Sequence, residues 1–225
     1  MAKFCTNCGR ELTEGEICNC RQTVESGDIF QNILGVLKGI FVKPIETIKE
    51  NAKEKNFVMS IILVGVMSLI TGLFAMAILK NAYSLMFEGA SSYLFSTTSI
   101  DLPYAKTFFT SLIVVFILSF VYVGLLYLVN TVIFKGSANY KEIYSLYGVV
   151  SIINTITLAV SAILVFVNLY VAIIVLVFGA LLSLLYTYHG LKFIGPDDEN
   201  KYGYIFLTTT ALYFVVIFVI TKIFS

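Results

Sequence analysis

The residues with the greatest potential for chemistry are four cysteines within the first 20 positions, and the sequence has no others. Cys5 and Cys8 form a CxxC pair followed by glycine, and Cys18 and Cys20 come after nine further residues. Four clustered thiolates are a ligand set for a structural Zn²⁺ and leave no open position for a catalytic metal. The sequence therefore predicts one structural zinc per chain, bound by Cys5, Cys8, Cys18 and Cys20. Because the second pair is one residue shorter than CxxC, a metal-free degenerate ribbon and redox-active thiols remain as alternatives.

The cysteine-bearing segment, residues 1–22, is too short to fold around a hydrophobic core of its own, so a metal ion would have to hold it together. Its CTNCGREL stretch, the Glu-Gly turn and the second cysteine pair resemble the small zinc ribbons at the amino termini of many bacterial membrane proteins. The resemblance covers residues 4–20 and implies a zinc-ribbon head.

The rest of the chain has the composition of a membrane protein. The 225 residues are 58% hydrophobic and 13% charged, whereas soluble domains are about half apolar and about a quarter charged. The mean hydropathy is +0.89. A net charge of +1 provides no basic surface for nucleic acid. MAKFCTNC contains no apolar signal region, so we expect no secretory signal. The expected surroundings are the lipid bilayer, without nucleic acid.

Five segments are long and apolar enough to cross a membrane, which takes about 20 residues each. The hydrophobic stretch 143–194 is too long for one crossing, so we divide it at Asn168. The predicted spans are 57–79, 107–134, 146–167, 169–191 and 203–221. The predicted fold is therefore an all-α integral membrane protein, with a five-helix membrane domain over residues 57–225.

Basic residues are distributed unevenly between the loops on the two sides of these spans. With the N-terminus inside, 12 of the 15 lysines and arginines fall on the inner side. This bias predicts a multi-pass protein of the cell membrane with a cytoplasmic N-terminus and an outside C-terminus. The cysteines then lie in a reducing compartment, which favours metal binding over disulfides. Tyr140, Tyr144 and Tyr147, around the start of the third span, are expected in the aromatic belt of the membrane interface.

Residues 23–56 are predicted to form a linker and two amphipathic helices ahead of the first span. In the segment 28–43, one helical stripe contains Ile29, Phe30, Ile33, Leu34, Leu37, Ile40 and Phe41. Pro44 suits the first turn of a second helix, PIETIKENAKEK, with Ile45 and Ile48 on one side. We expect both helices to lie in the membrane interface. The alternative is that they lie against the protein's own cytosolic face.

Two further stretches carry a resemblance to a known family. These are FVKPIETIKEN, which leads into the first span, and GSANYKEIYSLYGVVSI, which leads into the third. Together with five helices and short cytosolic loops, they resemble the Yip1-like family of membrane proteins. Eukaryotic members are linked to small GTPases through an acidic N-terminal motif, which this sequence lacks. Asp101-Leu-Pro-Tyr104 is superficially similar to that motif but lies in a predicted outside loop. The resemblance implies a bacterial accessory membrane protein, from a branch in which some members are associated with ABC-type transporters.

The predicted spans contain no aspartate, glutamate, lysine or arginine, although ion-coupled transporters usually need one. Their polar residues are uncharged amides and hydroxyls, namely Asn130, Ser151, Asn154, Thr155, Thr157, Ser161, Thr208, Thr209 and Thr210. We expect these to form hydrogen bonds between helices, with a polar path for a solute as the alternative. Small residues are expected at close helix contacts, namely Gly65, Gly72, Gly179, Ala180 and Ser183.

No set of residues in the sequence indicates catalysis. His189, the single histidine, ends the fourth span and is expected beside lipid headgroups. The acidic loop Asp197-Asp198-Glu199 is expected to be a solvated turn, with a divalent-cation site as the alternative. We therefore predict a protein that is not an enzyme but an accessory or scaffold protein that binds another membrane protein. The alternative is a solute-conducting permease or transporter subunit, which would need a continuous polar cavity at mid-membrane. A zinc-responsive membrane sensor is a third hypothesis.

Overall fold

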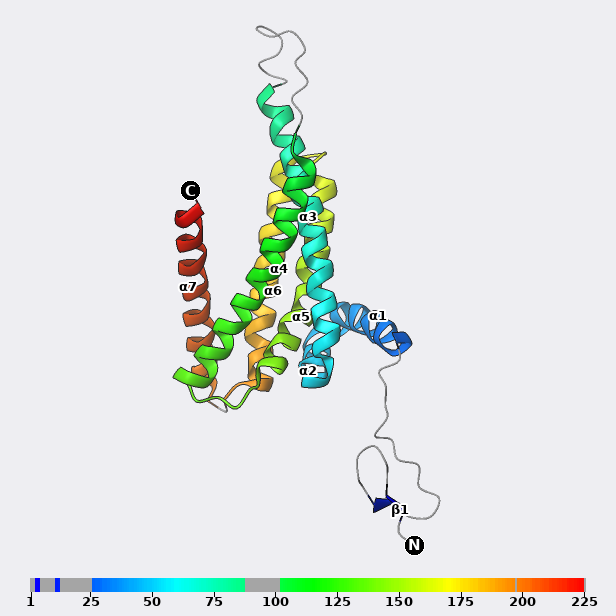
Figure 1. The fold of residues 1–225 in the computed structure, drawn as a ribbon, viewed down its shortest axis with the longest axis vertical. Coiled ribbons are helices and arrows are strands. Elements are labelled where there is room, and N and C mark those ends of the chain that lie inside the picture. Colours follow the sequence, from blue (N-terminus) through cyan, green and yellow to red (C-terminus); the bar gives the residue numbers. More distant parts are fainter. Residues whose placement is uncertain (1–2, 5–10, 13–25, 88–101, 197, 225) are drawn as a thin grey trace.

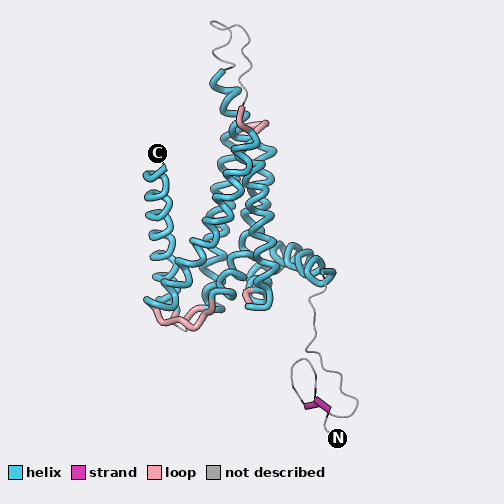
Figure 2. Tube along the Cα trace, viewed as in Figure 1, coloured by secondary structure: helices cyan, strands magenta, loops and turns pink. Residues whose placement is uncertain are grey.

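Helices make up almost all of the computed structural model, which describes residues 3–4, 11–12, 26–87, 102–196 and 198–224 (Figures 1 and 2). Five of these helices are long and apolar enough to cross a membrane, as predicted. They are α3 (Phe57–Phe87), α4 (Tyr104–Leu128), α5 (Tyr140–Leu164), α6 (Leu169–Ile194) and α7 (Glu199–Phe224). Near the N-terminus, the two-residue strands β1 (Lys3–Phe4) and β2 (Glu11–Leu12) pair antiparallel.

Four of the spanning helices, all but α4, are longer than the apolar segments from which they were predicted. Helix α3 continues eight residues beyond position 79, and α5 begins six residues before position 146. The chain after α4 continues as a short π-helix, η3 (Val129–Ile133). Hydropathy detects only the part of a helix that crosses hydrocarbon, whereas the helix itself ends where a cap satisfies its backbone.

The division of the long hydrophobic stretch at Asn168 is confirmed. Helix α5 ends at Leu164, and the Asn168 side chain caps the start of α6. Its Oδ1 accepts hydrogen bonds from the backbone N–H groups of Tyr170 at 2.9 Å and Val171 at 3.2 Å. An asparagine N-cap stabilises a helix start by about 1 kcal/mol, so this residue marks the turn between the two spans.

The two amphipathic helices exist, but they have different surroundings. Helix α1 (Ser26–Val42) projects sideways from one end of the bundle, and α2 (Pro44–Asn51) begins at its proline as predicted (Figure 1). Ile48 of α2 is completely buried against the bundle. The interfacial position predicted for α2 stays a prediction. The alternative, packing against the protein itself, is correct for the Ile48 side of this helix, because Ile48 is buried from water by protein rather than by lipid.

Helix α1 has two apolar faces. Val36 and Ile40 are each only 4% exposed and belong to the buried core, whereas Phe30 and Phe41 are 62% and 70% exposed. The second face therefore lies outside the protein core. A helix that runs sideways at the end of a set of spans, with large apolar side chains uncovered, has the geometry of an interfacial helix.

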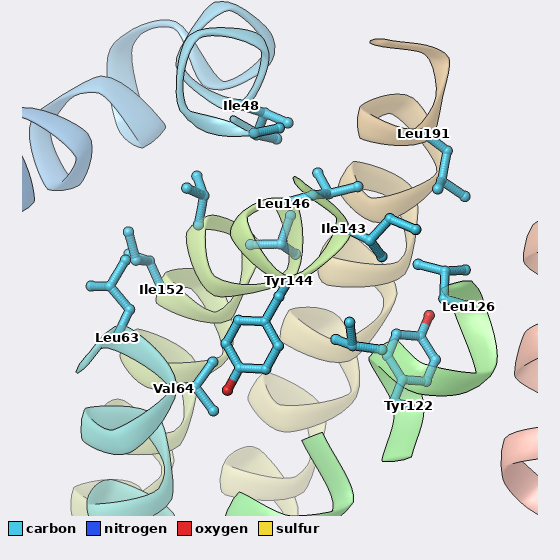
Figure 3. Packing of buried hydrophobic residues seen from close by; sticks show 14 of the residues in the cluster. Ile48, Leu63, Val64, Tyr122, Leu126, Ile143, Tyr144, Leu146, Ile152 and Leu191 are labelled. Carbon is cyan, nitrogen blue, oxygen red and sulfur yellow. The ribbon is translucent and has the colours of Figure 1, made fainter. Parts of the chain in front are cut away.

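The core is centred on the long contact between α3 and α5, at the end of the bundle near α2. Tyr144 of α5 is completely buried and lies beside Val64 of α3, while Ile48 lies above Leu146 (Figure 3). The Tyr144 ring is 5.3 Å from the ring of Phe57, edge to face. The aromatic belt predicted for Tyr144 is therefore wrong, because its ring fills the helix–helix interface instead of facing lipid headgroups.

Helix α7 stands largely apart from the other spans (Figure 1). It contacts α4, η3 and α6, and its Tyr213 ring lies 5.1 Å from the ring of Tyr122 of α4. Beyond this contact, Phe214 and Phe218 are more than 60% exposed. In a membrane, lipid chains would cover this part of the helix.

Candidate functional site

Most charged side chains of the described residues gather at one end of the bundle, which we call the platform. The platform consists of α1, α2, the short 3₁₀ helix η2 (Glu54–Asn56), the loop 134–139 with the first turn of α5, and the residues 195, 196 and 198 after α6. Both sequence stretches that carry the family resemblance contribute to it. Within the described residues, the platform is the part best placed to meet a water-soluble surface of a partner.

The first attachment of the platform to the bundle is a tight apolar contact. Ile48 of α2 lies against Leu146 of α5 at the point where α6 has a glycine, Gly190. A Cβ atom at position 190 would lie 3.1 Å from Ile48 Cγ2 and would collide with Leu146. The close approach of α2, α5 and α6 therefore depends on the absence of a side chain at Gly190.

The second attachment is polar and fixes the start of α5. The Asn139 side chain accepts a 2.7 Å hydrogen bond from the Lys141 backbone N–H, and Glu142 accepts one from the Asn139 N–H, which together form a capping box. Asn139 Nδ2 also donates to Glu54 at 3.0 Å, and Lys141 Nζ lies 2.6 Å from Glu54 Oε1. These contacts join η2, just before α3, to the first turn of α5.

The platform surface contains two neighbouring hollows. One, of about 720 Å³, lies between α1, α2 and η2, and it is lined mainly by polar and charged side chains such as Lys38 and Glu50. The other, of about 470 Å³, lies between α2, the start of α5 and the end of α6, beside Lys49 and Glu142. Lys53 borders both hollows. The platform therefore offers two adjoining polar recesses with both signs of charge.

One ion pair sits on the rim of the larger hollow. Lys43 Nζ lies 2.9 Å from Glu46 Oε2, with both side chains well exposed. The hydrogen bond and the charge of Glu46 raise the pKa of Lys43 above its usual value. Lys43 therefore stays protonated at neutral pH, and its exposed pair contributes little to stability because solvent screens it.

Another recess lies within the membrane part. It is a cleft of about 380 Å³ between α4 and α6, with its floor on α3 and α5. We call it the intramembrane cleft. Its lining consists of Met67, Thr71, Val115, Tyr147, Asn154, Thr157, Leu158, Leu176, Val177 and Ala180. The walls are mostly apolar, and the polar atoms are concentrated on the floor.

Most of the predicted polar residues in the spans bond to backbone or to a neighbouring helix. Asn154 Nδ2 donates to Ser183 Oγ of α6 at 3.0 Å, and Ser161 Oγ donates to the Ala172 carbonyl at 3.0 Å. Ser151, Thr155 and Thr157 donate to carbonyls of their own helix. The expected role in joining helices is confirmed for Asn154 and Ser161, whereas the bonds of Ser151, Thr155 and Thr157 stay within α5. Asn130, in η3, is buried, and neither side-chain atom has a hydrogen-bond partner among the described residues.

The small residues were predicted with mixed success. A Cβ at Gly72 would lie 2.8 Å from the Phe108 ring, and one at Gly179 would collide with Thr157, so both glycines allow close contacts. The prediction for Gly65 is wrong, because nothing lies within 4 Å of its Cβ position. A contact with neighbouring backbone was missed: at Gly148 of α5, a Cβ would lie 2.6 Å from the Cα atom of Ser60.

Two other candidate residues have local structural roles. His189 Nδ1 lies 3.0 Å from the Leu185 carbonyl of its own helix. Asp198 Oδ1 accepts a 3.0 Å hydrogen bond from the Asn200 N–H at the start of α7. The described residues contain no group of three or more histidine, cysteine, aspartate or glutamate side chains that could hold a metal ion. The structure thus gives Asp198 a capping role.

The four predicted zinc ligands lie outside the described residues. Strands β1 and β2, which flank the first cysteine pair in the sequence, are described and paired, with Lys3 opposite Leu12. The prediction of zinc bound by Cys5, Cys8, Cys18 and Cys20 therefore stays a prediction.

Comparison with known proteins gave one finding. A family model described as the Yip1 domain matches residues 38–221, which extend from within α1 to the last turns of α7. No curated protein and no solved structure gave a significant match. The matched region includes α2, η2 and the start of α5, which form most of the platform.

Proposed function

Because this chain belongs to the Yip1 family of membrane proteins, we propose that it is a non-catalytic accessory protein that binds and stabilises another membrane protein through its platform. The observation that carries this proposal is the pair of adjoining polar hollows, both bordered by Lys53. Recesses of mixed charge beside exposed lysines suit the loops of a partner protein, since complementary charges set orientation and specificity.

The way the platform is built supports a docking role. Glu54, Asn139 and Lys141 bond to one another across η2 and α5, so the surface is held in one arrangement before a partner arrives. A preformed surface loses less conformational freedom on binding than a flexible one. The exposed face of α1 would at the same time hold the platform close to the membrane, where the partner's own loops emerge.

The distribution of lysine and arginine supports an orientation with the platform in the cytosol. We propose a multi-pass protein of a bacterial cell membrane, with a cytoplasmic N-terminus and an outside C-terminus. An ABC-type transporter is the proposed partner class. This part of the proposal rests on the resemblance to bacterial members of the family.

The N-terminal head supplies a second proposed contact. Four thiols in a reducing compartment support one structural Zn²⁺, bound by Cys5, Cys8, Cys18 and Cys20. The zinc would fold a segment that is too small to fold alone, and it would present Arg10 to the partner.

The intramembrane cleft supports the scaffold over the alternative permease. A permease needs polar surface that continues towards both sides of the membrane, whereas this cleft has mostly apolar walls. The rings of Tyr122 and Tyr213 pack beside Tyr147 at its platform end. These features favour function by contact over conduction of a water-soluble solute.

The test is site-specific photo-cross-linking of the full chain in native membranes. A photoreactive amino acid replaces Lys53 in the platform or, as a matched control, Lys222, an exposed lysine at the last turn of α7. We expect position 53 to cross-link to one dominant membrane protein, a transporter subunit, and position 222 not to do so. The Lys49→Glu change should weaken that cross-link. Equal cross-linking at both positions would refute the proposal. So would solute flux by the purified protein alone that Asn154→Leu abolishes without unfolding it.

A further inference from the structure

The intramembrane cleft has the composition of a lipid site, and this role is separate from docking at the platform. We propose that it binds one neutral lipid with a free hydroxyl group, of the diacylglycerol type, with the hydroxyl on the floor and a chain between α4 and α6. Ligand sites typically combine mostly apolar walls with a few fixed polar groups. The cleft has this combination at about 380 Å³.

The polar atoms on the floor are fixed in position. Asn154 Nδ2 donates to Ser183 Oγ at 3.0 Å, so the amide is held and its Oδ1 has no hydrogen-bond partner among the described residues. Thr71 and Thr157 donate their hydroxyl protons to carbonyls of their own helices, at 2.8 Å and 3.0 Å. The free positions on Asn154, Thr71 and Thr157 are acceptors, so they suit a ligand that brings a donor such as an O–H group, and the Tyr147 hydroxyl can donate to an oxygen of the same ligand.

The depth and charge of the floor exclude a charged headgroup. Asn154 and Thr157 lie near the middle of α5, which runs from Tyr140 to Leu164. The lining contains no lysine, arginine or histidine that could pair with a phosphate. An unpaired charge near the centre of a bilayer costs at least about 2.5 kcal/mol. The occupant is therefore neutral.

The cleft is closed towards the platform and borders lipid at its side. The Tyr147 ring lies 5.6 Å from the Tyr122 ring, which contacts Tyr213 of α7. Farther from the platform, Val177 on the rim is 53% exposed, and α7 stands apart from the bundle there (Figure 1). A molecule already dissolved in the bilayer can therefore enter from the side, whereas one dissolved in water meets the tyrosine rings.

The test uses the full chain in phosphatidylcholine vesicles that contain a photoreactive diacylglycerol. Parallel vesicles contain phosphatidylglycerol with the same photoreactive chain. After irradiation, mass spectrometry maps the labelled peptides. We expect diacylglycerol to label the α5 and α6 segments that line the cleft and phosphatidylglycerol not to label them above the other lipid-facing segments.

Two variants and a matched control sharpen this test. Ala180→Phe fills the cleft from the α6 wall, whereas Leu181→Phe adds a ring on the neighbouring, lipid-facing position, which is 61% exposed. We expect Ala180→Phe to abolish labelling at the cleft and Leu181→Phe to leave it unchanged. Asn154→Leu should reduce it about threefold, the equivalent of one intramembrane hydrogen bond. Equal labelling in all variants, or equal labelling of the cleft by both lipids, would overturn the inference. Gel filtration selects folded protein before each measurement.

Discussion

Replacing Gly148 with alanine should separate the two central helices of the bundle. The added Cβ would lie 2.6 Å from Ser60 Cα and would also overlap the Ser60 side chain. Because a backbone atom is among the obstacles, rotation of a side chain cannot relieve the clash, and α3 and α5 have to move apart. Overpacking of this kind costs about 1–3 kcal/mol, more than the 0.5–1 kcal/mol that alanine gains over glycine within a helix. We expect a net loss of about 1–2 kcal/mol.

Gly65→Ala is the matched control, because it makes the same change in α3 where nothing lies within 4 Å. The assay is the recovery of monodisperse protein by gel filtration after heating tagged protein in one detergent. With about 2–4 °C per kcal/mol, Gly148→Ala should lower the melting temperature by about 2–8 °C. Gly65→Ala should leave it unchanged or raise it slightly. If Gly148→Ala melted at or above the temperature of Gly65→Ala, the close α3–α5 contact would be refuted.

Three further predictions concern the head, the topology and the start of α5. Purified protein should contain one zinc per chain, which Cys5→Ser or Cys8→Ser removes; less than about 0.2 zinc per chain in unchelated protein contradicts the site. A cysteine that replaces Ser91 should react with a membrane-impermeant thiol reagent in intact cells, whereas one that replaces Ser137, an exposed platform residue, should not. The reverse labelling pattern would contradict the cytoplasmic position of the N-terminus. Asn139→Ala should lower the free energy of unfolding by about 1 kcal/mol through loss of the helix cap, measured by thermal unfolding; an unchanged melting temperature would count against the cap.

The features that follow from local chemistry could be predicted from the sequence. An uninterrupted apolar run can span hydrocarbon wherever it lies in the fold, so the five spans followed from hydropathy. Asn168 and Pro44 act on the backbone next to them, so they marked helix starts correctly. Such signals do not depend on knowing which helix lies beside which.

The features that depend on neighbours could not be predicted. Helices α3 and α5 are apolar on most sides, so their sequences do not indicate which face meets protein and which meets lipid. Gly65 and Gly148 therefore look equivalent in the sequence, although only Gly148 lies at a contact. Tyr144 has the residue type of an aromatic belt, but the α3–α5 pairing buries it. The cleft around Asn154 arises from four helices and has no signature within any one of them.

The platform and the intramembrane cleft share α5 and should nevertheless act independently. Glu142 borders a platform hollow and Asn154 lies on the cleft floor, 12 residues apart, which is about 18 Å along an α-helix. Coupling between sites requires an element with two arrangements that each ligand favours differently. The buried core between α3 and α5 gives this segment one arrangement, so the two sites should not influence each other.

This independence can be measured with Lys53→Glu in the platform and Asn154→Leu in the cleft. In the double variant, we expect partner binding and lipid labelling each to fall by the product of the factors measured for the two single variants, within about twofold. This is the behaviour of distant sites that share no contacts. Partner binding is followed by cross-linking from a photoreactive residue at position 49, and lipid labelling by the photoreactive diacylglycerol. If Asn154→Leu alone weakened partner cross-linking several-fold in folded protein, α5 would have a second arrangement. The lipid would then regulate docking instead of occupying a separate site.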